Sequence, residues 1–130
     1  MDTSKQYIKM CDCGEIQERW KEREGDIVYD KNASRIYMLH HVNDRHKYGD
    51  YVWLPGQDQL QGMMNAEKYA KETATWRPAA LVRSFYLWMK DNCRLIYVSN
   101  FDSMEQLWLA FVMHELHGKR WNGEEWIDNG

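Results

Sequence analysis

Three cysteines and five histidines are the residues of this 130-residue chain best suited to bind a metal ion. Cys11 and Cys13 are separated by one residue, and two thiolates at this spacing can hold a soft metal such as zinc. A structural zinc site needs four ligands, and the third thiol, Cys93, is distant in the sequence. An odd and low cysteine count predicts no disulfide framework. The alternative is that Cys11 and Cys13 are small, partly buried residues.

His114 and His117 are the second pair that could bind a metal. In a zinc-protease helix two histidines are four residues apart with a glutamate between them, whereas here the spacing is three. A pair at i, i+3 still shares one helix face and could hold a metal. The alternative is two histidines in a last helical turn, where the carbonyl ends favour positive charge. We keep both pairs as metal candidates and predict no resident metal or cofactor.

The densest polar cluster combines histidines with carboxylates, the minimal set for acid–base catalysis. Its members are His40, His41, Asp44, Arg45, His46 and Asp50. In a strand, His40 and His41 point to opposite faces and cannot join one site. The sequence has no glycine-rich phosphate loop, nucleophile elbow or kinase signature. These patterns favour a protein that is not an enzyme, with a small metal-dependent enzyme as an alternative.

The first half of the chain predicts one helix followed by a hairpin. Asp12 and Glu15 have capping-box spacing and Gly25 is a helix stop, which predicts a helix over 12–24. The runs 26–30 and 35–42 are rich in strand formers and are separated by turn residues, so they predict a hairpin. A third strand is predicted over 50–54, ended by a Pro-Gly pair.

The second half predicts helices. Asp58 and Gln61 have capping-box spacing before an apolar stripe, and Pro78 suits a first helical turn. The strongest helical period follows it, on Leu81, Val82, Phe85, Trp88 and Met89. Ser103 and Gln106 predict another capped helix, which Gly118 ends. Its apolar stripe is Met104, Leu107, Trp108, Phe111 and Val112.

Two stretches outside these helices complete the expected architecture. Residues 95–98 are predicted as a fourth strand or an extended connector, and a turn is predicted at Asn122-Gly123. Strands followed by helices are typical of an α+β fold: a small antiparallel sheet of three to four strands packed against two to three amphipathic helices. We expect one domain over 1–130, with flexible ends near 1–6 and 122–130.

Charge and composition limit the partners. The net charge is −3, so no global basic field attracts nucleic acid or anionic lipid. The sequence contains no apolar run long enough to cross a membrane and no amino-terminal leader, which predicts a cytoplasmic setting. One local group of basic and aromatic residues keeps nucleic-acid binding as an alternative. It consists of Trp76, Arg77, Arg83, Tyr86, Trp88, Lys90 and Arg94.

Three stretches carry a resemblance that covers nearly the whole chain. They are residues 7–13 with Ile16, Gln17 and Trp20, then residues 53–61, then residues 103–112. Together and in this order they resemble a group of small proteins encoded by bacteriophages and prophages, over about residues 7–126. The resemblance implies a phage or prophage origin and a bacterial host cytoplasm, and it carries no activity or catalytic residue.

The leading hypothesis is a non-enzymatic accessory protein that binds a phage or host protein. Seven Trp and eight Tyr support it, because interfaces are enriched in these residues. Trp53, Leu60, Leu107, Trp108 and Phe111 are predicted core. Gln57 and Gln59 add no apolar area, so we expect them at a contact surface, together with Trp121 and Trp126 in the acidic tail. Self-association through this tail is left open.

Overall fold

The computed structural model describes residues 1–40, 50–64, 78–91 and 95–129. Within them the first half contains α1 (Lys5–Cys11), α2 (Gly14–Gln17), β1 (Ile27–Asp30), β2 (Arg35–Met38) and β3 (Tyr51–Leu54). The second half contains α3 (Gln57–Met64), α5 (Pro78–Lys90), α6 (Leu95–Val98), α7 (Met104–His117), β4 (Lys119–Trp121) and β5 (Trp126–Asp128). The predicted α+β class is confirmed.

The strands form two separate antiparallel units. β1 lies in the middle of a three-stranded sheet of order β2-β1-β3, and β4 pairs with β5. The predicted hairpin of β1 and β2 is confirmed, and the Asp30 carboxylate accepts hydrogen bonds from the backbone N–H groups of Asn32 and Ala33 in its turn. The carboxylate therefore satisfies turn amides that have no strand partner.

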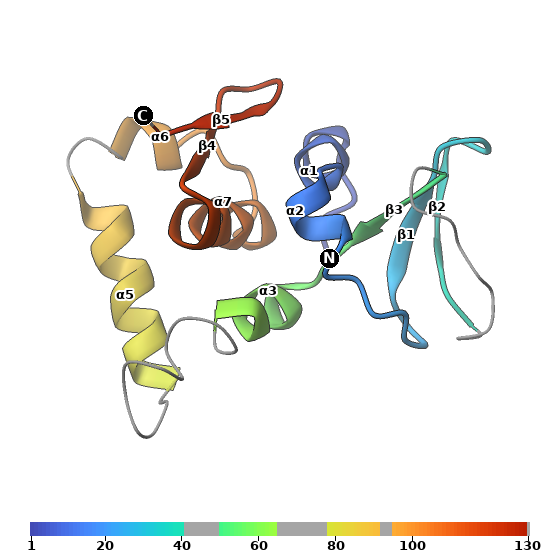
Figure 1. Cartoon of the computed structure of the whole chain (residues 1–130), viewed down its shortest axis with the longest axis horizontal. Helices are drawn as coiled ribbons and strands as arrows, with labels where there is room; N and C mark the ends of the chain where they lie inside the picture. The colour runs from blue at the N-terminus through green and yellow to red at the C-terminus, as the bar shows by residue number, and fades with distance from the viewer. Residues whose placement is uncertain (41–49, 65–77, 92–94, 130) are drawn as a thin grey trace.

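α7 lies at the centre of the molecule. Figure 1 shows α1 and α2 between α7 and the three-stranded sheet, and α5 on the opposite flank of α7. Residues Trp108 through Met113 are all buried, so every side of this helix is covered. On the α5 side, the Phe85 ring stacks on Trp108 with centroids 3.9 Å apart, and Phe111 packs edge-on against Phe85 at 5.4 Å. These rings join the two helices in one core.

The caps of α7 are as predicted. The Ser103 hydroxyl accepts a hydrogen bond from the Gln106 backbone N–H, and Gly118 ends the helix in the left-handed conformation with φ of 62°. The predicted start of α3 is wrong by two residues. The Gln59 side chain, not that of Gln61, reaches back to a backbone N–H at the start of the helix, and the residue it contacts is Gly56.

The predicted helix over 12–24 is wrong in extent. Its helical part is only Gly14–Gln17, and α1 precedes it as an element that the sequence analysis missed. The physical reason is the buried Gln17 side chain. Its amide donates to the carbonyls of Cys11 and Trp53 and accepts from the Trp53 backbone N–H. The two bonds to Trp53 hold Gln17 against β3. The chain that follows has no regular secondary structure over residues 20–23.

The predicted strand or extended connector over 95–98 is also wrong, because these residues form the short helix α6. The Ile96 carbonyl of α6 accepts hydrogen bonds from the side chains of Ser99 and Asn100, which follow the helix. A run of four apolar residues fits a strand and a helix equally well. Here the side chains of the polar residues that follow bind a carbonyl of the run and so favour the helix. The expected flexible ends contain Ser4, which caps α1, and strand β5.

Candidate functional site

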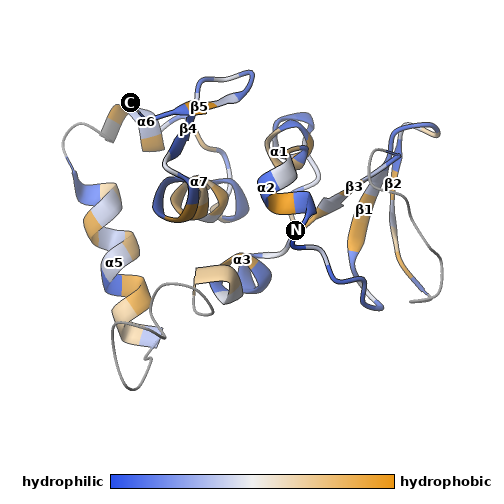
Figure 2. Cartoon of the chain, in the orientation of Figure 1, coloured by the Kyte–Doolittle hydropathy of each residue, from blue (hydrophilic) through white to orange (hydrophobic). Residues whose placement is uncertain are grey.

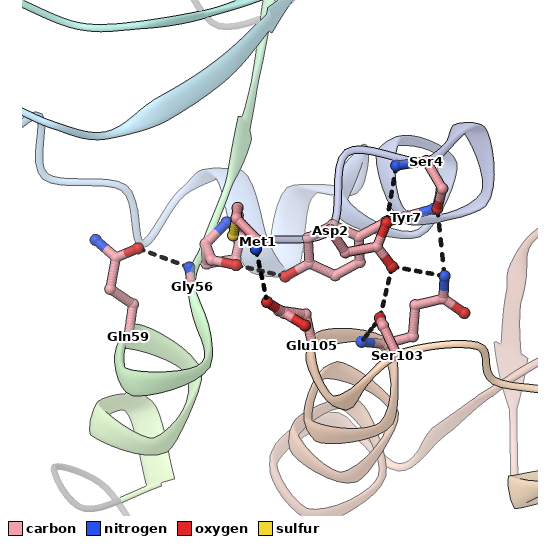
Figure 3. Close-up of polar contacts among 10 residues, drawn as sticks. Met1, Asp2, Ser4, Tyr7, Gly56, Gln59, Ser103 and Glu105 are labelled. Carbon is pink, nitrogen blue, oxygen red and sulfur yellow. Dashed lines mark hydrogen bonds and ion pairs between the residues drawn. The ribbon is translucent and has the colours of Figure 1, made fainter.

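The starts of α1 and α7 meet at one carboxylate, which Figure 3 shows. Asp2 Oδ2 accepts hydrogen bonds from Ser103 Oγ at 2.5 Å and Gln106 Nε2 at 2.7 Å, and Asp2 Oδ1 accepts one from the Ser4 backbone N–H. Gln106 is fully buried, and its Oε1 accepts from Gln6 Nε2 and the Asp102 backbone N–H. We call these residues, Asp2, Ser4, Gln6, Ser103 and Gln106, the amino-terminal junction.

The amino-terminal junction places a negative charge where a helix start favours one. Burial raises the pKa of the Asp2 carboxyl, but the hydrogen bonds from Ser103, Ser4 and Gln106 outweigh burial and hold the pKa below its usual value. The Met1 ammonium lies 3.8 Å from Glu105 Oε1 beside it. The chain's own carboxylate thus occupies the position that an anionic ligand would take, and we interpret the junction as structural.

Cys11 and Cys13 lie at the end of α1 and the start of α2. Cys11 is fully buried, which raises the pKa of its thiol well above the usual value. Burial likewise raises the pKa of the Cys13 thiol to about 12. The raised pKa of each thiol disfavours the thiolate, which is the form that binds a metal. Cys93 lies outside the described residues.

The histidine candidates lie on α7. His114 Nδ1 is 3.4 Å from Glu115 Oε1, and His117 lines a surface hollow with Glu15, Glu18 and Arg19. In the part of the chain that the structure describes, no three His, Cys, Asp or Glu side chains are arranged to hold a metal ion. Most of the polar cluster after His40 lies in residues 41–49, outside the described ranges.

Three of the four residues expected at a contact surface make contacts within the fold. Gln59 donates from Nε2 to Asp26 Oδ1 at 3.0 Å, in addition to its bond with Gly56, whereas Gln57 is half-buried. Trp121 is only 6% exposed and packs against Trp126 with centroids 5.1 Å apart. Trp126 Nε1 donates to the Met10 carbonyl. Trp126 therefore fastens the β4–β5 hairpin to α1.

The outward side of α5 is an apolar surface, and sequence reasoning placed one of its residues, Val82, in the core. Leu81, Phe85 and Trp88 are buried as predicted, but Val82 is 58% exposed. Tyr86 is 54% exposed and Leu87 51%. Figure 2 shows hydrophobic residues recurring along α5, which lies at the edge of the molecule. The signal in the sequence is that the apolar residues of α5 cover more of the helix surface than the one stripe that packs against the core.

Two cations lie among these apolar side chains. At i, i+4 spacing, Val82, Tyr86 and Lys90 form one row and Arg83 and Leu87 form the next. Lys90 Nζ lies 6.0 Å from the centre of the Tyr86 ring, and both Arg83 and Lys90 are exposed. α5 contains no acidic residue. We call these five residues the α5 outer face, a surface that is both apolar and basic.

Comparisons with known proteins add no family. A scan against protein-family models finds no match, and searches of curated proteins and of solved structures find no significantly similar chain. No helix among the described residues is long and apolar enough to cross a membrane.

Proposed function

We propose that this protein is a non-enzymatic binding module that docks the α5 outer face against another protein. The observation that carries the proposal is the exposure of Val82, Tyr86 and Leu87 on a single helix. Contiguous apolar side chains with polar margins are typical of interaction sites, and tyrosine and arginine are enriched at the residues that dominate binding energy. A helix with anchors at i, i+4 suits an apolar groove on the partner.

Charge indicates the chemistry of the partner. In an antiparallel pairing of two copies of α5 centred between Tyr86 and Leu87, Arg83 of one copy would lie opposite Lys90 of the other. Like charges in direct opposition disfavour that pairing. A partner with acidic side chains beside an apolar groove would instead pair with both cations. The phage resemblance suggests a phage or host protein as this partner.

Nucleic-acid binding is the alternative function that this helix keeps open. Arg83, Tyr86 and Lys90 are exposed on one helix and are residue types that contact phosphates and bases. Trp88 is buried, which removes one of the predicted stacking residues, while Trp76, Arg77 and Arg94 lie outside the described ranges. The exposed apolar side chains Val82 and Leu87 favour a protein partner, since neither contributes to a phosphate contact.

The test is capture of partners from host-cell lysate with matched variants. The site variant carries Val82→Ser and Tyr86→Ser. The control carries Met38→Ser and Met104→Ser, at side chains that are 48% and 47% exposed on other elements. We expect the wild type and the control to retain the same protein after nuclease treatment, and the site variant to lose it. Serine has a helix propensity close to those of valine and tyrosine, so all three proteins should fold.

Charge reversal completes the test. Arg83→Glu with Lys90→Glu should abolish capture, because it places acidic side chains against an acidic partner. Retention of the partner by the Val82→Ser and Tyr86→Ser variant would contradict the proposal. Loss of all capture after nuclease treatment would replace it with nucleic-acid binding, which a titration with DNA at rising salt would then verify.

A further inference from the structure

A second surface lies beside Trp53, away from α5, and has the composition of a ligand site. It is a hollow of about 520 Å³, within the roughly 300–1,000 Å³ of small-molecule sites. Its lining joins the stretch after α2 to β3 and α3, and consists of Arg19, Lys21, Arg23, Trp53, Gln59, Gly62 and Met63. We call it the basic hollow.

The basic hollow gathers cations from a stretch whose charges alternate in sequence. Residues 18–24 read Glu-Arg-Trp-Lys-Glu-Arg-Glu, and none of the three glutamates lines the hollow. Glu18 lines the hollow beside His117 together with Arg19, and Glu24 lines one beside Gly25 together with Arg23. Residues 20–23 have no regular secondary structure. The helix expected there would have spread the same cations around its axis at 100° steps.

The wall of the basic hollow is apolar and closely packed. Trp53 is 4% exposed and Met63 8%, and the Trp20 ring stacks on Trp53 with centroids 6.3 Å apart and planes 9° from parallel. The Trp53 indole N–H is screened from solvent and has no hydrogen-bond acceptor among the described residues. Because this N–H is covered, it reports on packing at the wall and is not itself a contact for a ligand.

One buried carboxylate fixes the shape of the basic hollow. Asp26 is 5% exposed, and its Oδ2 accepts hydrogen bonds from Trp20 Nε1 and the Arg23 backbone N–H. Its Oδ1 accepts from Gln59 Nε2. Asp26 therefore joins two residues of the lining, Arg23 and Gln59, and also holds Trp20, before any ligand arrives. It does not line the hollow itself, and the lining carries three cationic side chains and no carboxylate.

We propose that the basic hollow binds a small organic anion with an apolar body. Lys21 and Arg23, which are exposed, would contact the acidic group with Arg19, and the apolar body would pack on Trp53 and Met63. A free inorganic anion would leave the apolar wall unused, and an uncharged compound would leave the cations unused. The site is independent of the α5 outer face.

The experiment compares two fluorescent probes that differ by one charged group. The anion is 8-anilinonaphthalene-1-sulfonate, and N-phenyl-1-naphthylamine has the same rings without the sulfonate. The site variant is Lys21→Gln with Arg23→Gln. The control is Lys5→Gln with Arg35→Gln, a pair of exposed cations outside both the basic hollow and the α5 outer face. The Arg23 backbone bond to Asp26 is kept in the site variant.

We expect the anionic probe to bind the wild type and the control, and to shift the indole N–H resonance that Trp53→Phe removes. The site variant should lose about tenfold or more in affinity, since two charge-assisted contacts are gone. Its affinity for the neutral probe should change less than about twofold, because only the charged contacts have been removed. The proposal is overturned if the anionic probe does not bind, if both probes bind equally well, or if only the control variant loses affinity.

Discussion

α7 and α5 are both long and rich in apolar residues, yet α7 is buried on all sides of its middle and α5 on one side only. α7 is buried at six consecutive positions, Trp108 through Met113, so no side of its middle faces solvent. α5 is buried at Leu81, Phe85 and Trp88, which share one stripe, while Val82, Tyr86 and Leu87 are more than half exposed. Apolar content alone therefore does not separate the two helices.

The difference lies in how many elements pack on each helix. α7 contacts α1, α3 and β4, and its aromatic side chains also meet Phe85 of α5. α5 has a covered side toward α7 and an outer face that the described elements leave open. A helix that is apolar all round is normally a core helix. The exposed apolar outer face of α5 is thus what separates this helix from α7, and it is the surface that we propose to bind a partner.

Truncating one aromatic residue on each helix should give the largest contrast. Phe111→Ala should lower the free energy of unfolding by about 3–5 kcal/mol, because it removes a fully buried ring. Tyr86→Ala should lower it by less than about 1 kcal/mol, since the ring is largely in water and loses little more than its contact with Lys90. Urea unfolding followed by circular dichroism measures both. Equal losses would mean that α5 is covered on both sides.

Two leucines within α5 provide a matched pair of the same residue type. Leu81 is 3% exposed and Leu87 is 51% exposed. Leu81→Ala should cost about 2–5 kcal/mol, whereas Leu87→Ala should change stability by no more than about 0.5 kcal/mol. The same urea titration applies, with the slope of the transition checked for a two-state change. A large loss for Leu87→Ala would remove the α5 outer face as a free surface.

The fold could be predicted from sequence where the signal is local. The caps of α7 and the hairpin of β1 and β2 depend on residues close together in the chain, and both are confirmed. The end of α2 could not be predicted, because Gln17 is bound to Trp53, 36 residues away. Trp126 could not be placed for the same reason, since its indole donates to a carbonyl 116 residues away.

The candidate sites show the same limit. The stripe through α5 was recognised, but Val82 was assigned to the core because the pattern does not reveal how many neighbours the helix has. The charges of 18–24 suggested a solvated helix face. The gathering of three of their cations in one hollow depends on the chain leaving helical geometry after α2. There Gln17 is bonded to Trp53 and Asp26 to Gln59, and both partners are far away in the sequence.

The start of α7 provides the smallest and most specific test of how firmly this helix is held. Asp2 is ionised in the amino-terminal junction, with a pKa below the usual value for the reasons given above. A depressed pKa stabilises the fold above the unfolded pKa near 4, and this stabilisation is lost as pH falls through the folded pKa. Asp2→Asn removes the titration and should cost on the order of 1 kcal/mol at pH 7, since the site is partly solvated.

The pH dependence separates this charge effect from simple loss of packing. The stability difference between wild type and Asp2→Asn should be constant between about pH 6 and 8 and shrink between about pH 5 and 2. Glu15, whose pKa the hydrogen bond from Lys119 lowers, titrates in the same range in both proteins and cancels from the difference. A pH-independent difference would show that the Asp2 charge does not hold α7. The helix would then depend on its surrounding core alone, which would sharpen its contrast with α5.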